Sequence, residues 1–149
     1  MKCLVLLTSL LLGATASPVR QRQTTQANIS SFSASTNTNS DGAVITYDIE
    51  LPGLVSTHCS YSDSTSGSTL PAVAQTPCDD PAVRWQFRQD PSLPGGQGRY
   101  RIVVIYALAS GAGKAGFHEW DPSDFPLQLV GGGDETVYRG AADFVIDMS

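Results

Sequence analysis

The sequence predicts an all-β protein, a single compact antiparallel β-barrel or sandwich of about seven to eight short strands with one disulfide. The first observation behind this prediction is an apolar–polar alternation with a period of two, which is typical of strands with one buried face. The second is the presence of 14 glycines and 9 prolines, many of which lie in turns between the alternating segments. The third is that no window supports a helix longer than a turn or two. Together they indicate a sandwich or a barrel.

The clearest predicted strand covers residues 43–51, in which every second residue is apolar. Residues 99–108 begin with the same alternation but become apolar on both sides from 103 to 107, which predicts a central strand covered on both faces. Residues 62–81 hold a polar run and three prolines and are expected to form a loop. Further strands are predicted over residues 54–61, 82–88, 114–120, 126–130 and 137–148.

The start of the chain has the features of an exported protein. Residues 1–16 contain the three parts of a secretory signal peptide: a basic start, a short apolar run and small residues before the cleavage point. The apolar run is too short to span a bilayer. We therefore predict removal of residues 1–16, a disordered lead-in over residues 17–27, a β-barrel domain over residues 28–149, and a secreted, extracellular location. Asn28, in the triplet Asn-Ile-Ser, is a candidate N-glycosylation site.

The charge of the mature chain is acidic. The sequence carries 9 basic and 14 acidic residues, and cleavage of the signal peptide removes one of the basic residues, Lys2. Nucleic acids and anionic membranes are bound by basic surfaces that displace their counterions. We therefore expect no nucleic acid and no membrane among the partners of this protein.

The cysteines also fit an oxidising compartment. Cys3 leaves with the signal peptide, and Cys59 and Cys78 remain as an even pair. A disulfide between them would close a loop of about twenty residues, for which chain-entropy estimates give about 3 kcal/mol. The alternative, a catalytic thiol, would leave the other cysteine unpaired outside the cell. We predict a single Cys59–Cys78 disulfide.

Four motifs follow one another between residue 29 and about residue 148. They are Ile29-Ser30-Ser31-Phe32, Tyr47-Asp48-Ile49-Glu50, Cys59 and Cys78 followed by Trp85-Gln86-Phe87, and Tyr138-Arg139-Gly140-Ala141-Ala142-Asp143 before an apolar closing strand. In this order they resemble the secreted fungal β-barrel family typified by the major allergen of Alternaria. The resemblance implies a β-barrel fold and a role as an allergen, elicitor or effector.

The chain departs from this family in its cysteines. Many relatives carry a second disulfide near the C-terminus, and Tyr138 stands where one of its cysteines would be. The extra cysteine that the allergen itself uses for a covalent dimer is also absent. Any homodimer must therefore be non-covalent, and Val103 and Ile105, on the outward side of their predicted strand, are candidates for its contact.

The polar residues form no catalytic constellation. A serine hydrolase of the Gly-x-Ser-x-Gly type is excluded because that motif is missing, and a glycosidase needs two inward carboxylates, whereas the acidic residues fall mostly in turns or on outward strand positions. His118 and Glu119, with Asp121 and Asp124 nearby, could ligate a cation, but adjacent strand residues point to opposite faces. We predict a non-enzymatic protein with no cofactor and no metal.

Four arginines form the candidate partner-binding site: Arg84 and Arg88 on one predicted strand, Arg99 and Arg101 on the next. If the turn at residues 91–98 makes these strands neighbours, the guanidinium groups cluster on one sheet face and suit an acidic partner. The alternative is that the arginines pair across strands with acidic residues and are otherwise solvated.

The large aromatic residues form a second candidate site. Some relatives in the family above are described as binding flat phenolic ligands, and Trp85, Phe87, Tyr100 and Tyr106 are the candidates here for lining such a pocket. The alternative is a packed core, which a domain of this size needs for stability. Phe117 and Trp120 are expected to surround the same interior.

These features lead to one main functional hypothesis. We expect a secreted fungal effector-like or elicitor-like protein, without enzymatic activity, that binds host extracellular or defence proteins and acts in virulence or in host immune recognition. The first alternative is a secreted carrier of a small apolar or phenolic ligand, for which a cavity of several hundred Å³ would be expected. The second is an extracellular hydrolase with an unrecognised pair of carboxylates.

Overall fold

The structure of the chain, a computed structural model, describes residues 25–37, 42–91 and 98–149. These residues form ten strands and one short 3-10 helix, η1, and no α-helix occurs among them. The elements in chain order are β1 (Thr25–Asn37), β2 (Gly42–Leu51), β3 (Val55–Ser62), β4 (Val73–Pro77), β5 (Val83–Gln89), β6 (Tyr100–Ala107), β7 (Gly113–Trp120), η1 (Pro122–Asp124), β8 (Leu127–Val130), β9 (Gly133–Thr136) and β10 (Phe144–Met148).

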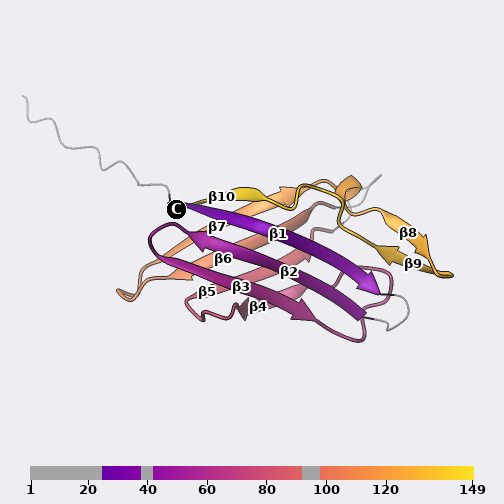
Figure 1. Cartoon of the computed structure of the whole chain (residues 1–149), viewed down its shortest axis with the longest axis horizontal. Coiled ribbons are helices and arrows are strands. Elements are labelled where there is room, and N and C mark those ends of the chain that lie inside the picture. The colour runs from indigo at the N-terminus through magenta and orange to yellow at the C-terminus, as the bar shows by residue number, and fades with distance from the viewer. Residues whose placement is uncertain (1–24, 38–41, 92–97) are drawn as a thin grey trace, which may run out of the picture.

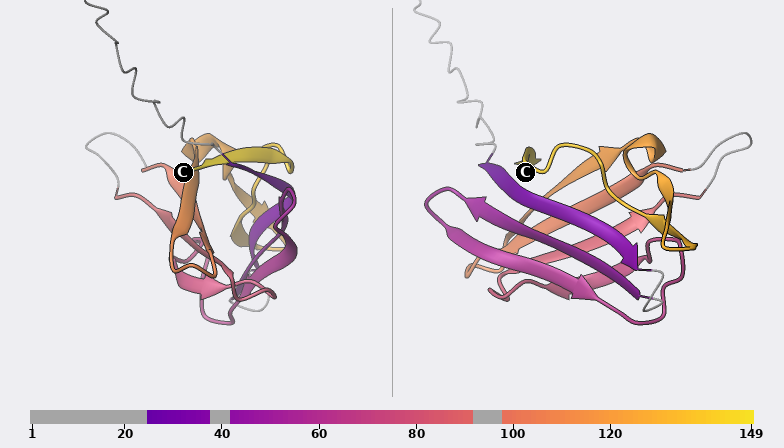
Figure 2. Two further views of the ribbon diagram at one scale, coloured as in Figure 1. Left: turned by 90° about the vertical axis from the view of Figure 1, so that its left-hand side faces the viewer. Right: turned by 45° about the vertical axis from the view of Figure 1, so that its right-hand side comes forward.

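Eight of the strands form two antiparallel sheets that pack face to face. The first sheet has the order β10-β1-β2-β3 and the second has the order β4-β5-β6-β7, while β8 and β9 pair with each other. Figure 1 looks onto the first sheet, with the second sheet behind it, and the left view of Figure 2 shows the two sheets facing each other across the interior. The predicted all-β antiparallel class is confirmed. Because the sheets are not closed into a barrel, the architecture is a sandwich.

Residues that alternate along the strands fill the interior. Tyr47 and Ile45 on β2 and Trp85 and Phe87 on β5 are almost completely buried, as the period-two pattern of those segments predicts. Tyr47 and Trp85 meet across the two sheets, with ring centroids 5.3 Å apart and an interplanar angle of 86°. Edge-to-face contacts of this kind stabilise aromatic cores.

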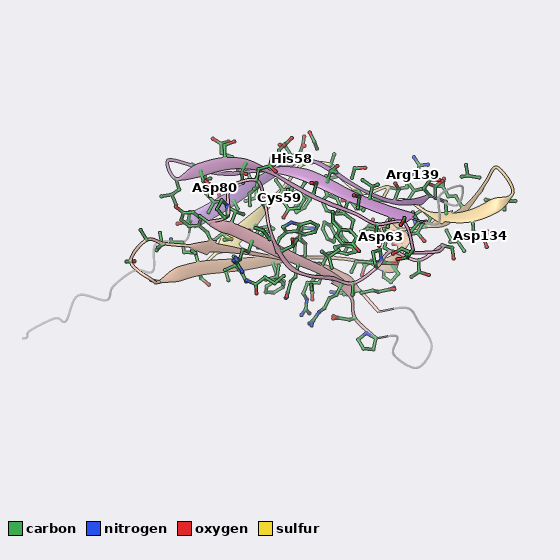
Figure 3. The ribbon with its side chains drawn as sticks, turned by 90° about the horizontal axis from the view of Figure 1, so that it is seen from below. His58, Cys59, Asp63, Asp80, Asp134 and Arg139 are labelled. Carbon is green, nitrogen blue, oxygen red and sulfur yellow. A yellow bond between two sulfur atoms is a disulfide. The ribbon has the colours of Figure 1, made fainter. Side chains whose placement is uncertain are left out.

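The disulfide joins the sheets at one edge of the sandwich. Cys59 on β3 and Cys78, directly after β4, are bonded, with their Cα atoms 4.3 Å apart, so the predicted pairing is confirmed. The backbone N–H of Asp79 donates to the carbonyl of His58 at 2.9 Å, and the N–H of Asp80 donates to the Thr57 hydroxyl at 2.8 Å. Figure 3 shows this end of the molecule, with His58, Cys59 and Asp80 labelled. A structural disulfide is compatible with an extracellular protein.

The opposite edge is held by backbone contact between β7 and the end of the chain. Ala115 and Ser149 exchange two backbone hydrogen bonds, of 3.2 and 3.0 Å. Gly116 makes the close approach possible, because a Cβ atom there would lie 2.4 Å from the carbonyl oxygen of Asp147. This edge therefore depends on the absence of a side chain at position 116.

Two sequence predictions change in the structure. β1 begins at Thr25, so the domain starts three residues before the predicted position 28, and Thr25–Ala27 belong to a strand instead of the lead-in. β4 lies inside residues 62–81, which we expected to be loop; it is an edge strand with Pro77 as its last residue, a place where proline is tolerated. The predicted signal peptide and residues 17–24 of the lead-in lie outside the described residues.

The β8–β9 hairpin projects from the sandwich at the end away from the C-terminus (Figure 1). Its base is fixed by the buried Thr36 and Thr136, since the N–H of Thr136 donates to the Thr36 hydroxyl at 2.9 Å and the Thr136 hydroxyl donates to the Ser68 carbonyl at 2.6 Å. Its apolar residues remain exposed, with Leu129 at 76%. The part of the chain that the structure describes contains no membrane-spanning helix.

Candidate functional site

The outer face of the second sheet carries the predicted arginines in a regular grid. β5, β6 and β7 are neighbours in perfect antiparallel register, so three cross-strand rows run over this face. The rows are Arg88–Arg101–Glu119, Gln86–Val103–Phe117 and Arg84–Ile105–Ala115. Three of the four predicted arginines thus share one surface, and Arg99 lies just before β6. Residues 92–97 of the turn that joins these strands lie outside the described residues.

Acidic residues neutralise most of this arginine cluster. Arg88 and Arg101 are directly opposite each other, and Asp90 contacts both, with N–O distances of 3.3 Å to each. Arg101 also donates its Nε–H to Glu119 at 2.7 Å, and Arg99 lies 3.4 Å from Asp121. Pairing with acidic residues therefore accounts for three of the arginines: Arg99 and Arg101 pair across strands, the alternative considered above, and Arg88 pairs with Asp90 of its own segment. Arg84 is exposed and has no ion-pair partner within the described part of the chain.

Three apolar side chains of the grid form an uncovered apolar patch: Val103 and Phe117 of the middle row and Ile105 of the third row. Val103 and Ile105 are half-buried and Phe117 is 60% exposed, and no described element packs over them. We expected residues 99–108 to form a strand covered on both faces, but in the described structure no element covers its outer face. Phe117 points outward instead of into the interior, where we predicted it. The guanidinium carbon of Arg101 lies 5.4 Å from the Phe117 ring centroid, a cation–π contact that holds both side chains on the surface.

The outer face of the first sheet has a different character. Asp48, Glu50, His58 and Ser60 all point to solvent there, and the His58 and Asp48 side chains bond at 2.8 Å across β2 and β3. This is the polar surface expected of a sheet that faces water. The outer face of the second sheet, with its uncovered apolar side chains, therefore differs from the outer face of the first sheet.

The aromatic residues predicted to line a ligand pocket pack in the core. Trp85, Phe87 and Tyr100 are buried, and Tyr106 lies partly buried against the same cluster. Tyr100 stacks on Phe125 with ring centroids 4.0 Å apart. These four residues therefore form a packed core, the alternative to a ligand pocket considered above. They do not line the pocket described next.

A pocket of about 150 Å³ lies near the edge where β7 approaches β10. This volume is smaller than the roughly 300 Å³ at which sites for drug-sized ligands begin. We call it the aromatic pocket because four of its lining side chains carry aromatic rings. Its lining residues are His118, Trp120, Asp124, Tyr138, Gly140, Ala141 and Phe144.

A bulge in β1 lies next to the residues that line the aromatic pocket. Ser31 has a φ of 57°, in the left-handed region, and the pairing of β1 with β2 shifts between Ser30 and Ser33. The freed N–H of Ser31 donates to the Asp143 carboxylate at 3.0 Å, and that of Phe32 donates to the Ala142 carbonyl at 2.9 Å. The first and last of the four motifs, more than one hundred residues apart, therefore meet here.

Phe32 is the ring on which the pocket aromatics pack. Its centroid lies 4.8 Å from Trp120, 4.8 Å from Tyr138 and 5.7 Å from Phe144. Sequence reasoning missed this site because its residues come from separate segments, and Tyr138 drew attention only as the start of the fourth motif and as the position of a missing cysteine. The sequence feature that could have indicated this site is an aromatic residue, Tyr138, followed two positions later by a glycine, Gly140.

Burial and one carboxylate set the electrostatics of the aromatic pocket. Burial lowers the pKa of His118, although the nearby Asp124 and Glu119 carboxylates act in the opposite direction. Burial raises the pKa of Tyr138; a hydrogen bond with Trp120 opposes this change, and Asp124 adds to it. Asp124 is therefore close enough to influence both rings.

His118 and Glu119, considered above as cation ligands, lie on opposite faces of β7, with His118 in the pocket and Glu119 paired to Arg101. Within the described residues, no group of three or more His, Cys, Asp or Glu side chains is arranged to hold a metal ion. The sequence-based cation site therefore has no counterpart in this part of the fold.

Asp63 is the carboxylate most strongly perturbed by its surroundings. It accepts hydrogen bonds from the backbone N–H groups of Ala43, Thr65 and Ser66 and from the hydroxyls of Tyr61 and Ser66. These bonds, led by that of the Ser66 hydroxyl, hold its pKa well below the usual carboxyl range. These partners belong to the end of β3, to the turn that follows it and to the start of β2, so Asp63 fixes the loop under the sandwich.

The predicted glycosylation site, Asn28, lies in β1 between Glu50 of β2 and Val145 of β10 and is exposed. Its side chain is therefore accessible on the outer face of the first sheet. Neither a scan of protein-family models nor a search of curated proteins finds a match to this chain.

Proposed function

We propose that this chain is a secreted, non-enzymatic binding protein that recognises another protein outside the cell through the outer face of its second sheet. Export is supported by the signal-peptide pattern of residues 1–16, and the Cys59–Cys78 disulfide fits the same compartment. The resemblance to fungal allergens and effectors supports a host extracellular or defence protein as the partner. Virulence or host immune recognition is then the biological role.

The observation that carries this proposal is the uncovered apolar patch of Val103, Ile105 and Phe117 on the outer face. Phe117 is 60% exposed between two rows that contain arginines, and Val103 lies directly beside it on β6. Interface cores are enriched in exactly these residue types, aromatic side chains and arginine. The outer face of the first sheet carries Val44 and Val145, but among its described residues it has no exposed Phe, Tyr or Trp side chain.

The face is also prepared for binding by its ion pairs. Asp90 and Glu119 hold Arg88 and Arg101 in defined positions, so these long side chains have lost part of their freedom before a partner arrives. Pre-organisation reduces the entropic cost of association. Arg84, which has no ion-pair partner among the described residues, remains available for a carboxylate of the partner. A partner that fits presents an apolar side chain to Phe117 and an acidic one to Arg84.

The proposal is tested by affinity capture on the oxidised protein. Extracellular fluid of a plant or insect host is passed over wild-type protein, and each captured protein is purified and titrated against wild type and variants by calorimetry. Phe117→Ser and Arg84→Ser are expected to weaken binding of the true partner at least about tenfold each, as truncation of interface anchors does. The matched control is Val44→Ser, which removes an apolar side chain of 46% exposure from the first sheet.

Two outcomes would overturn the proposal. One is a partner whose affinity is the same for wild type, Phe117→Ser and Arg84→Ser. The other is a wild-type protein that sediments as a dimer while Phe117→Ser sediments as a monomer, because the face would then be occupied by a second copy of this chain.

A further inference from the structure

We propose that an N-linked oligosaccharide on Asn28 covers the outer face of the first sheet beside β10 and leaves the outer face of the second sheet open to a protein partner. The inference deepens the proposed function and rests on the export that this function assumes, because N-glycosylation takes place on secreted chains. It is carried by the place of the acceptor triplet Asn28-Ile29-Ser30 in the sheet, by the free amide of Asn28 and by the exposed Val145 beside it.

The acceptor triplet lies inside β1 with its acceptor side chain facing outward. Asn28 and Ser30 are exposed and Ile29 is buried, so the two residues that define the triplet share the outer face of the sheet. β1 lies between β10 and β2 in the sheet nearer the viewer in Figure 1. An asparagine on the inward face of this strand would leave no room for a sugar, whereas Asn28 has solvent above it.

Asn28 is an unusual residue at this place in a sheet. Asparagine is depleted in strands, and Asn28 is paired on both sides, with Val145 of β10 and with Glu50 of β2. Its side-chain amide makes no hydrogen bond within the described residues, whereas the amide of Gln26, two positions earlier on the same face, donates to Asp147 at 3.1 Å. The Asn28 amide is therefore free to carry a substituent without loss of a contact that holds the sheet together.

The neighbour of Asn28 on β10 offers an apolar contact to the sugar. Val145 lies directly opposite Asn28 and is 48% exposed. Side chains opposite each other in a sheet have their Cβ atoms about 5 Å apart. Because the first sugar is bonded to Asn28 itself, its C–H groups reach the Val145 side chain, and removal of both apolar surfaces from water stabilises the contact.

The charges of the two sheets fit this division of the surface. The four strands of the first sheet contain no lysine and no arginine. The arginines, which interface cores favour, lie on the strands of the second sheet. A bulky, hydrated oligosaccharide makes the first sheet less accessible to other proteins. One face of the sandwich then carries the sugar, and the opposite face carries the apolar patch and the arginines.

The attachment is a transfer from a lipid-linked oligosaccharyl diphosphate to the nascent chain, before β1 pairs with its neighbours. The bond from the sugar C1 atom to Asn28 Nδ2 forms as the bond from C1 to the diphosphate oxygen breaks. The lipid diphosphate leaves with the electron pair of the broken bond. The proton that Nδ2 loses passes to a basic group of the transferase and from there to water.

The mass of the exported protein tests the attachment. The full chain is produced in a eukaryotic secretory host, and the mass of the exported protein is measured before and after treatment with peptide:N-glycosidase. Wild type and Ser33→Ala, which changes an exposed serine of β1 outside the triplet, are expected to lose the mass of one oligosaccharide. Asn28→Gln and Ser30→Ala are expected to lose none. A wild type that is exported without an oligosaccharide, or that is not exported, overturns the proposal.

Hydroxyl-radical footprinting then tests whether the oligosaccharide covers this face. Ser30→Ala keeps Asn28 but carries no sugar, so it is the reference for the glycosylated wild type. We expect oxidation of Val145 to be severalfold slower in the glycosylated protein. Phe117, on the outer face of the second sheet, is expected to be oxidised at the same rate in both proteins. Equal oxidation of Val145 in the two proteins overturns the proposed cover.

This inference and the proposed function fail on different results. A captured partner is expected to bind glycosylated wild type and Ser30→Ala with equal affinity, because the oligosaccharide lies on the opposite sheet; a partner that binds only Ser30→Ala contradicts this expectation. Absence of the oligosaccharide overturns the inference and leaves the proposed function, which does not need it, unchanged. Slower oxidation of Val145, together with a partner that is insensitive to Phe117→Ser and Arg84→Ser, overturns the proposed function and supports the cover.

Discussion

Gly140 packs directly against the ring of Tyr138, two residues before it. A Cβ atom at position 140 would lie 2.3 Å from the Tyr138 hydroxyl oxygen and 2.6 Å from the ring carbon that carries it. The hydroxyl is fixed from the other side by its 2.8 Å bond to the Ala141 carbonyl. The Tyr138 ring therefore cannot remain in place if residue 140 has a side chain.

Gly140→Ala is expected to destabilise the fold by about 1–3 kcal/mol, the usual cost of overpacking a closely packed site. Urea unfolding measures the change. Gly67→Ala is the control, since a Cβ atom at Gly67 meets nothing within 4 Å. If the two variants unfold at the same urea concentration, Tyr138 is not held under Gly140 in solution.

Replacing both cysteines, as Cys59→Ser with Cys78→Ser, is expected to lower the free energy of unfolding by about 3 kcal/mol. The bridge links residues 19 positions apart, so its loss frees a loop of that length in the unfolded chain. Thermal unfolding with and without dithiothreitol provides the check. Wild type should lose stability on reduction, whereas the double variant should not respond; a wild type indifferent to reductant would contradict the prediction.

Asp63→Asn is expected to lower the melting temperature at pH 7 and to weaken the dependence of stability on acid pH. The folded-state pKa of Asp63 is lowered from the ordinary value of 3.8, mainly by the Ser66 hydroxyl. Its contribution is therefore complete above that value and is lost as the pH falls below it towards the folded-state pKa. Melting curves between pH 2 and pH 7 test this, with the exposed Asp134→Asn as the control that should follow wild type.

Tyr47→Phe is expected to leave the free energy of unfolding unchanged or to raise it. The Tyr47 hydroxyl is buried without a hydrogen-bond partner in the described part of the structure, and burial raises its pKa. Removing an unsatisfied buried polar group relieves a desolvation cost of about 1–3 kcal/mol while the ring contact with Trp85 remains. A loss of more than 1 kcal/mol in urea unfolding would show that the hydroxyl has a partner after all.

The strand pattern of this chain was accessible from sequence because each central strand buries one face. The alternation in residues 43–51 and 82–88 identifies β2 and β5 and the inward direction of Tyr47 and Trp85. β4 was missed because Pro77 at its end and the flanking Pro71 and Pro81 indicate a loop, and only the position of the strand at the edge of the sheet makes Pro77 acceptable. Local sequence carries no information on that position.

The two surface sites differ in how far sequence could predict them. The arginine grid follows from period two once β5 and β6 are paired, but its neutralisation depends on Asp90 and Glu119, which come from different segments. The direction of Phe117 could have been derived from its place beside Val103 in the register. The aromatic pocket could not have been predicted from the sequence. Its residues are brought together by the bulge at Ser31 and by Phe144, which is distant from Ser31 in the sequence.

The two edges of the sandwich differ in their sensitivity to reducing conditions. β3 and β4 are edge strands, and unpaired edge strands are templates for strand addition by other chains. The Cys59–Cys78 bridge keeps them against each other, whereas the opposite edge relies on Ala115, Gly116 and Ser149, which no reductant affects. Reduction therefore loosens only the β3–β4 side, which keeps the hydrogen bonds from the Asp79 and Asp80 N–H groups to β3. A reducing medium is thus expected to make this edge, and not the other, the place where strand addition by another chain begins.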